Sequence, residues 1–167
     1  MRRILAVLLE NEAGALSRVV GLFAQRNYNI ESLTVAPTED ETLSRLTLTT
    51  SGDANKIKQI VKQVDKLIEV VSVVDLCNDD HIERELMLLK VRADGDARQE
   101  IKRSADIFRG QIVDVTAHTY TIQMVGTGDK LDAFIRAVSD SGVSATILEV
   151  VRSGVSGMSR GDRALAI

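Results

Sequence analysis

Residues 11–16, Asn-Glu-Ala-Gly-Ala-Leu, carry the residue types best suited to bind a small charged ligand. The amide of Asn11 can both donate and accept hydrogen bonds, and Gly14 gives the backbone freedom to approach a ligand closely. A helix that begins at Ala15 presents unpaired backbone N–H groups at the positive end of its dipole, where a carboxylate is stabilised. An ordinary strand-to-helix turn has the same composition, so these residues alone leave both interpretations open.

A second candidate lies at residues 26–30, Arg-Asn-Tyr-Asn-Ile, between the expected first helix and the next strand. Asn27 is typical of a left-handed residue that ends a helix. The amide of Asn29 stands at the head of a strand, where it could face the binding turn of a neighbouring subunit if two sheets pair edge to edge.

The remaining reactive side chains do not form a catalytic set. His81 lies in a polar linker and His118 in an expected hairpin turn, so both are expected to be solvated. Cys77 is the single cysteine, which excludes an intrachain disulfide and leaves too few ligands for zinc; a buried or half-buried structural thiol is expected. Residues 126–128, Gly-Thr-Gly, resemble half of a phosphate-binding loop but lack its full glycine spacing. We therefore predict no catalytic residue and no metal site.

Composition indicates a globular chain that neither spans a membrane nor binds nucleic acid. Of its 167 residues 44% are hydrophobic, and the net charge is −3. No run approaches the ~20 apolar residues of a membrane span, and the N-terminus shows no small-residue cleavage site, so we expect a cytoplasmic protein. Neither half has the basic excess that would attract a phosphate backbone.

Hydrophobic periodicity predicts the element order βαββαβ twice. Each copy corresponds to the ferredoxin-like fold, in which two helices cover one face of an antiparallel sheet. The match of Gly52-Asp53 with Gly128-Asp129 supports a tandem repeat. The expected strands are 4–9, 30–36, 44–50, 68–76, 85–93, 111–116, 119–125 and 144–151, and the expected helices are 15–26, 53–65, 97–109 and 129–140.

This pattern predicts an α+β chain with an N-terminal domain at 1–76, a linker at 77–83 and a second domain at 84–167. The first strand is apolar on both sides, which favours coverage of the open sheet face or edge by another domain or chain. The tail from Ser153 is expected to fray, although Ala164, Leu165 and Ile167 could dock on a partner.

A nucleic-acid-binding module can share the βαββαβ order, but it stacks bases on aromatic residues of its central strands. Here Phe23, Phe108 and Phe134 belong to expected helices, and Tyr120 is the one aromatic residue on a strand. The aromatic pattern therefore argues against this class.

The motif Asn-Glu-x-Gly-Ala-Leu after the first strand resembles the ACT domain, a module that senses amino acids. The segments 4–17 (ILAVLLENEAGALS) and 20–33 (VGLFAQRNYNIESL), together with the tandem second domain, resemble the small regulatory subunits of acetolactate synthase. This resemblance covers essentially the whole chain. It implies a non-catalytic subunit in branched-chain amino-acid biosynthesis that activates a separate catalytic subunit and confers allosteric feedback inhibition by valine.

The resemblance also implies where the effector and the partners bind. Valine is expected at the interface of two ACT domains in a homodimer, and leucine or isoleucine would satisfy the same chemistry. No cofactor is expected in this chain, whereas the large catalytic subunit, a transferase, is expected to hold thiamine diphosphate, magnesium and FAD. A free-standing ACT sensor that regulates another enzyme is the alternative. The implied valine-binding residues are Asn11, Gly14, Ala15 and Leu16 of one chain with Asn29 and Ile30 of the other.

The second domain departs from the sensing motif. Residues 94–98, Asp-Gly-Asp-Ala-Arg, replace Asn-Glu-x-Gly-Ala-Leu and place carboxylates where a ligand carboxylate would lie. We therefore expect no valine site there, and a role in dimer formation and contact with the catalytic subunit instead.

Overall fold

The computed structural model describes residues 1–142 and 144–166 and divides the chain into two compact units. The first unit contains residues 1–83 and the C-terminal segment from Gly154, and the second contains residues 84–153. The segment after Ser153 therefore packs with the first unit, which differs from the expected boundary of a second domain at 84–167.

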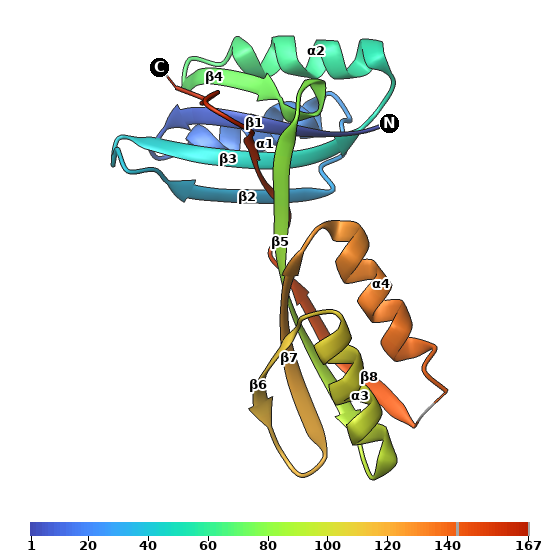
Figure 1. Cartoon of the computed structure of the whole chain (residues 1–167). Coiled ribbons are helices and arrows are strands. Elements are labelled where there is room, and N and C mark those ends of the chain that lie inside the picture. The colour runs from blue at the N-terminus through green and yellow to red at the C-terminus, as the bar shows by residue number, and fades with distance from the viewer. Residues whose placement is uncertain (143, 167) are drawn as a thin grey trace. The chain divides into compact units, whose positions relative to one another are not determined.

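The first unit has the predicted order βαββαβ (Figure 1). Its antiparallel sheet has the strand order β2-β3-β1-β4, so the apolar strand β1 lies inside the sheet, paired with β3 on one side and with β4 on the other. The elements are β1 (Arg2–Glu10), α1 (Ala15–Gln25), β2 (Ser32–Pro37), β3 (Leu43–Ser51), α2 (Ala54–Asp65) and β4 (Val70–Asp75).

Local signals at the helix ends act as the sequence predicts. Asp53 caps α2 by accepting a hydrogen bond of 2.8 Å from the backbone N–H of Lys56. Asn27 adopts a left-handed φ of 56° after α1, and Tyr28 donates its backbone N–H to the carbonyl of Phe23 at 2.8 Å. These contacts satisfy backbone groups that the helix ends would otherwise leave unpaired.

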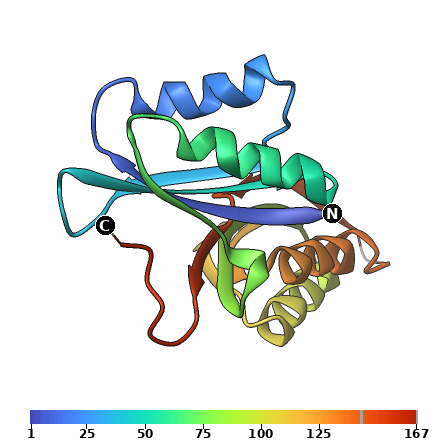
Figure 2. The same cartoon turned by 90° about the horizontal axis from the view of Figure 1, so that it is seen from above.

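Both helices cover one face of the first sheet, as Figure 2 shows from above. Leu5, Val7 and Leu9 of β1 pack there against the buried stripes of α1 and α2, which include Phe23 and Ile60. The alternate residues of β1 face the opposite side and are buried as well. The predicted need for cover on both faces of this strand is therefore confirmed.

The cover on the opposite face comes from the C-terminal segment of the same chain. Val155 is buried with Ile4, Ala6 and Leu76, and strand β9 (Ser156–Ser159) pairs with β5 (His81–Ala93), the strand that follows β4 in the chain. The expectation that the tail frays is wrong for this segment, because burial of Val155 and Leu165 holds it against the sheet. The expected docking residue Ile167 lies outside the described residues.

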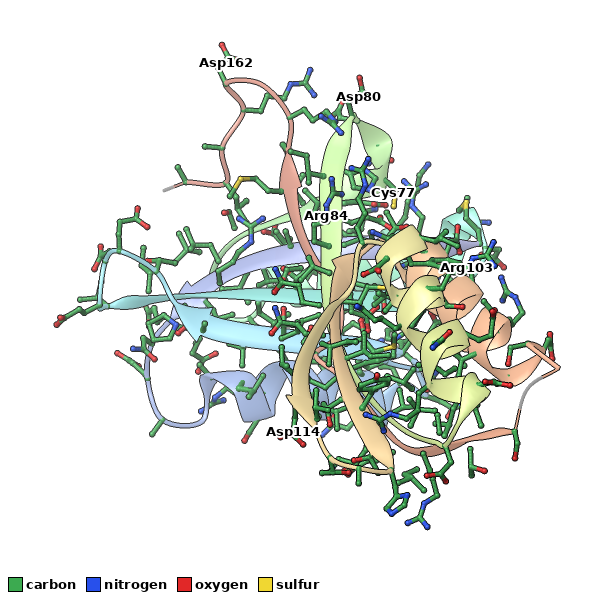
Figure 3. All side chains as sticks on the ribbon, turned by 60° about the horizontal axis from the view of Figure 1, so that its bottom comes forward. Cys77, Asp80, Arg84, Arg103, Asp114 and Asp162 are labelled. Atoms are coloured by element: carbon green, nitrogen blue, oxygen red, sulfur yellow. The ribbon has the colours of Figure 1, made fainter. Side chains whose placement is uncertain are left out.

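The expected linker at 77–83 is also structured. A short 3-10 helix (Leu76–Asn78) follows β4, and β5 (His81–Ala93) begins four residues before the predicted start. The turn that follows β9 carries Asp162 at its tip (Figure 3), and Arg160 donates its backbone N–H to the carbonyl of Asp80 at 3.0 Å. This contact joins the tail to the start of β5.

The second unit repeats the βαββαβ order, with the strand order β6-β7-β5-β8. Alternation along β5 explains its packing: Met87, Leu89 and Val91 are buried under the helices, while Leu86 and Leu88 face outward and are exposed. Its further elements are α3 (Asp96–Ile107), β6 (Gln111–Val115), β7 (Thr119–Gly126), α4 (Gly128–Ser139) and β8 (Ala145–Arg152).

The two units align differently from the expected repeat match. Helix α4 is capped by Thr127, which accepts from the backbone N–H of Lys130 at 3.3 Å, so Gly126-Thr127 corresponds to Gly52-Asp53. Lys56 and Lys130 confirm this correspondence, because each packs its aliphatic chain directly against the glycine before the cap. Matching Gly52-Asp53 with Gly128-Asp129 was wrong by two residues.

Candidate ligand-binding site

Asn11 is held in place by the start of β3. Its backbone N–H donates to the carbonyl of Thr42 at 2.8 Å. Its side-chain Nδ2 donates to the carbonyl of Glu41 at 3.0 Å, and its Oδ1 accepts from the hydroxyl of Ser44 at 3.1 Å. The amide therefore keeps one N–H and one lone pair for a ligand, in a fixed orientation. Sequence reasoning missed Glu41 and Ser44, which lie 30 or more residues away in the chain.

Gly14 forms the N-terminal cap of α1 in a left-handed conformation, with φ of 89° and no side-chain capping bond. Ala15 donates its N–H to the carbonyl of Glu12 at 3.2 Å. The N–H groups of Leu16 and Ser17 have no acceptor among residues 1–142 and 144–166. A Cβ added at Gly14 would meet nothing within 4 Å, so the space beside Gly14 at the start of α1 is open. Such a turn can bind a carboxylate.

The apolar residues of the predicted site differ in their exposure. Ala15 is buried in the core, so only its backbone is available at this turn. Leu16 and Ile30 are half-buried and pack against the edge of the same core, which leaves part of each side chain exposed to line a ligand.

Asn29 lies at the other end of β3 from this turn. Its carbonyl accepts from the hydroxyl of Thr50 at 2.7 Å, and its side chain is exposed. Asn11 instead contacts Ser44, and Ser44 lies six positions before Thr50 in an extended strand, about 20 Å away at roughly 3.3 Å per residue. One chain therefore does not bring the two halves of the predicted site together.

The equivalent turn of the second unit is occupied by its own side chains. Arg98 donates to the carbonyl of Ala117 at 3.0 Å, and its guanidinium lies 4.3 Å from the centre of the Tyr120 ring. His118 contacts the carboxylate of Asp94 and is exposed in its turn, as expected. The arginine lies near the position where the first unit presents the partly exposed Leu16, so the two turns differ in shape as well as in charge.

The structure also bears on the cysteine, on possible metal sites and on possible membrane spans. Cys77 is half-buried, as expected. Among the described residues no group of three or more His, Cys, Asp or Glu side chains could hold a metal ion. In the same part of the chain, no helix has the length and hydropathy needed to cross a membrane.

Comparison with known proteins gives a consistent family over nearly the whole chain. Residues 5–72 match the family described as the AHAS small subunit-like ACT domain, and residues 84–161 match the small subunit of acetolactate synthase. The acetolactate synthase small subunit of Haemophilus influenzae is 63% identical over 163 residues, and the isozyme 3 small subunit of Escherichia coli is 60% identical; each alignment covers 98% of both chains. The crystal structure of the acetolactate synthase small subunit from Thermotoga maritima is 37% identical and superposes with a TM-score of 0.86, covering 98% of this chain and 99% of that one.

Proposed function

Because the chain belongs to the family of acetolactate synthase small subunits, the regulatory subunits of that enzyme, we propose that it activates the catalytic subunit and confers feedback inhibition by valine. The observation that carries the effector proposal is the uncapped first turn of α1. The N–H groups of Leu16 and Ser17 have no acceptor among the described residues, and Gly14, which precedes them, leaves open the space that a side chain would fill.

Valine satisfies the chemistry of this turn. Its carboxylate pairs with the free N–H groups at the helix N-terminus, and its ammonium group donates to the remaining lone pair of Asn11. Its isopropyl group packs against the exposed parts of Leu16 and of Ile30 from a second chain. Ala15 contributes backbone only, since its side chain is buried.

The distance between the two halves of the site supports a homodimer. Asn29 precedes β2, which is an edge strand of its sheet. Pairing of two such edges around a two-fold axis would bring Asn29 of one chain to the turn of the other. Valine bound at both sites would then stabilise one arrangement of the paired sheets, and a coupling of about 1–3 kcal/mol is enough for regulation.

We assign the second unit to contact with other subunits. Leu86, Leu88, Leu148 and Val151 form an exposed apolar group on its sheet and offer a surface for the catalytic subunit or a second copy. In this proposal thiamine diphosphate, magnesium and FAD belong to the catalytic partner. A free-standing sensor that acts on another enzyme is the competing function.

The decisive experiment mixes the purified chain with an acetolactate synthase catalytic subunit and measures acetolactate formation with and without valine. We expect turnover to rise with added chain and to fall again with valine. Absence of activation, with no complex detected by size-exclusion chromatography, would favour the free-standing sensor. Activation without a valine response would reject the effector assignment alone.

A further inference from the structure

A cavity lies on the sheet face opposite the helices, beside the C-terminal segment. Its volume is about 720 Å³, within the usual range of small-molecule sites. Leu8 and Thr47 of the sheet form its floor, the β2–β3 hairpin around Pro37 forms one wall, and Leu165 of the tail lies on the other side. The lining is mainly apolar, and the cavity shares none of the residues assigned to the valine site.

Arg45 is a charged residue that lines this cavity from the sheet. It lies on β3 directly between Leu8 of β1 and Ala36 of β2, so apolar neighbours flank it within the sheet. Its Nη2 donates to the carbonyl of Gly157 in β9 at 3.0 Å. Its Nε is buried and has no hydrogen-bond partner among the described residues. Burial lowers the pKa of the guanidinium, which nevertheless stays charged.

The acidic residues near the cavity do not neutralise Arg45. None of the ion pairs between described residues involves Arg45. Glu39 and Asp40 line the rim at the exposed tip of the hairpin, and Asp40 is occupied as the acceptor of two hydrogen bonds from Thr42. Arg163 at the opposite rim is paired with Asp79 at 2.6 Å. Arg45 is partly buried with no counter-ion among the described residues, which is costly, and an anion in the cavity would offset this cost.

We propose that this cavity binds an amphiphilic monoanion, whose carboxylate pairs with Arg45 while its aliphatic chain lies along Leu8 and Leu165. The positive charge of Arg45 would repel a cation, and a neutral apolar molecule would leave the guanidinium without a counter-ion. Because Arg45 also holds the carbonyl of Gly157, ligand binding acts directly on the contact between the sheet and β9.

Octanoate and its uncharged analogue octanamide test this proposal on the full-length chain, with ¹H–¹⁵N NMR spectra as the readout. Octanoate is expected to shift the backbone amides of residues 34–36 and 156–159, and octanamide is expected to bind about tenfold more weakly. Equal affinity for the two compounds would overturn the proposal, and so would octanoate shifts confined to residues 11–17. No binding of octanoate at millimolar concentration would overturn it as well.

Substitutions at Arg45 separate charge from packing. Arg45→Gln should lower the affinity for octanoate about tenfold, whereas Arg45→Lys should retain most of it. Arg26→Gln is the matched control, because Arg26 is exposed and contacts Gln63 between α1 and α2, away from the cavity. Unchanged octanoate affinity in Arg45→Gln would contradict the proposal. The comparison of octanoate with octanamide on the unaltered chain remains decisive if a variant fails to fold.

Discussion

Ser44 donates a hydrogen bond of 3.1 Å from its hydroxyl to Oδ1 of Asn11, so a buried residue of β3 orients the amide that follows β1. Ser44→Ala removes this bond and lets the amide rotate. We expect the valine concentration for half-inhibition to rise about fivefold, as for a loss of roughly 1 kcal/mol, with activation unchanged. Ser141→Ala, which removes a hydroxyl bond to Val138 in the second unit, is the control. An unchanged valine response in Ser44→Ala would show that Asn11 does not need this orientation.

Gly14 leaves open the space that a side chain would fill at the start of α1. Gly14→Asp adds a carboxylate where we propose that the carboxylate of valine binds, and we expect it to abolish valine inhibition while activation persists. Enzyme assays with the reconstituted complex measure both effects.

Gly161→Asp is the matched control for this substitution, because Gly161 also has a positive φ, 73°, and nothing within 4 Å of an added Cβ. It should carry a similar backbone strain and leave the valine response unchanged. Lost activation with retained valine binding in Gly14→Asp would reject the assigned role of this turn.

Asn11 and Asn29 contact residues at opposite ends of β3, and this distance leads to a test of the proposed dimer. In a two-fold dimer formed by one Gly14→Asp chain and one Asn29→Ala chain, one site carries both changes and the other carries neither. Random mixing should therefore restore about one quarter of the valine sites, although each variant alone binds none. Equilibrium dialysis with labelled valine counts the sites. If subunit exchange is confirmed and no valine sites are recovered, Gly14 of one chain and Asn29 of the other do not form a shared site.

The element order could be read from the sequence because each helix and strand carries its own periodicity and its own caps, such as Asp53 and Asn27. The contacts that orient Asn11 in the candidate site could not be predicted from the sequence. Asn11 meets Glu41 and Ser44 only because β1 and β3 are neighbours in the sheet, a pairing that no local pattern encodes. Strand β9 was missed for a similar reason, since it is four residues long and is held through the burial of Val155 against β1.

His81 provides a pH-dependent contribution to stability. Burial alone would lower its pKa, but hydrogen bonds to the carboxylate of Glu83 at 3.0 Å and to the carbonyl of Asp79 outweigh burial and raise the pKa above its ordinary value. A raised folded-state pKa stabilises the fold below the unfolded value of about 6.5, and this contribution disappears as the pH rises through the folded value. The free energy of unfolding should therefore fall from about pH 6 upward more steeply in the unaltered chain than in His81→Gln. NMR titration of the imidazole should show a lower pKa in Glu83→Gln.

Arg152 and Glu85 form a bidentate ion pair in the second unit, with Nε–Oε1 at 3.0 Å and Nη2–Oε2 at 2.9 Å. The Glu85 side chain is 7% exposed, and its hydrogen bonds raise the pKa of the Arg152 guanidinium against the effect of burial. Arg152→Met should lower the free energy of unfolding by about 3 kcal/mol, because it leaves a buried carboxylate without its partner. The exposed Arg103 (Figure 3), 4.0 Å from Glu100, is the control, and Arg103→Met should change stability by less than about 0.5 kcal/mol.

The double variant Arg152→Met with Glu85→Met distinguishes a buried charge from lost packing. Replacing both partners by apolar side chains removes the unpaired carboxylate, so most of the lost stability should return. Urea denaturation of the four proteins of this cycle measures the coupling between the two residues. If the double variant is as unstable as Arg152→Met alone, the loss comes from the packing of the arginine chain or from its ion pair with Asp132, rather than from the isolated charge of Glu85.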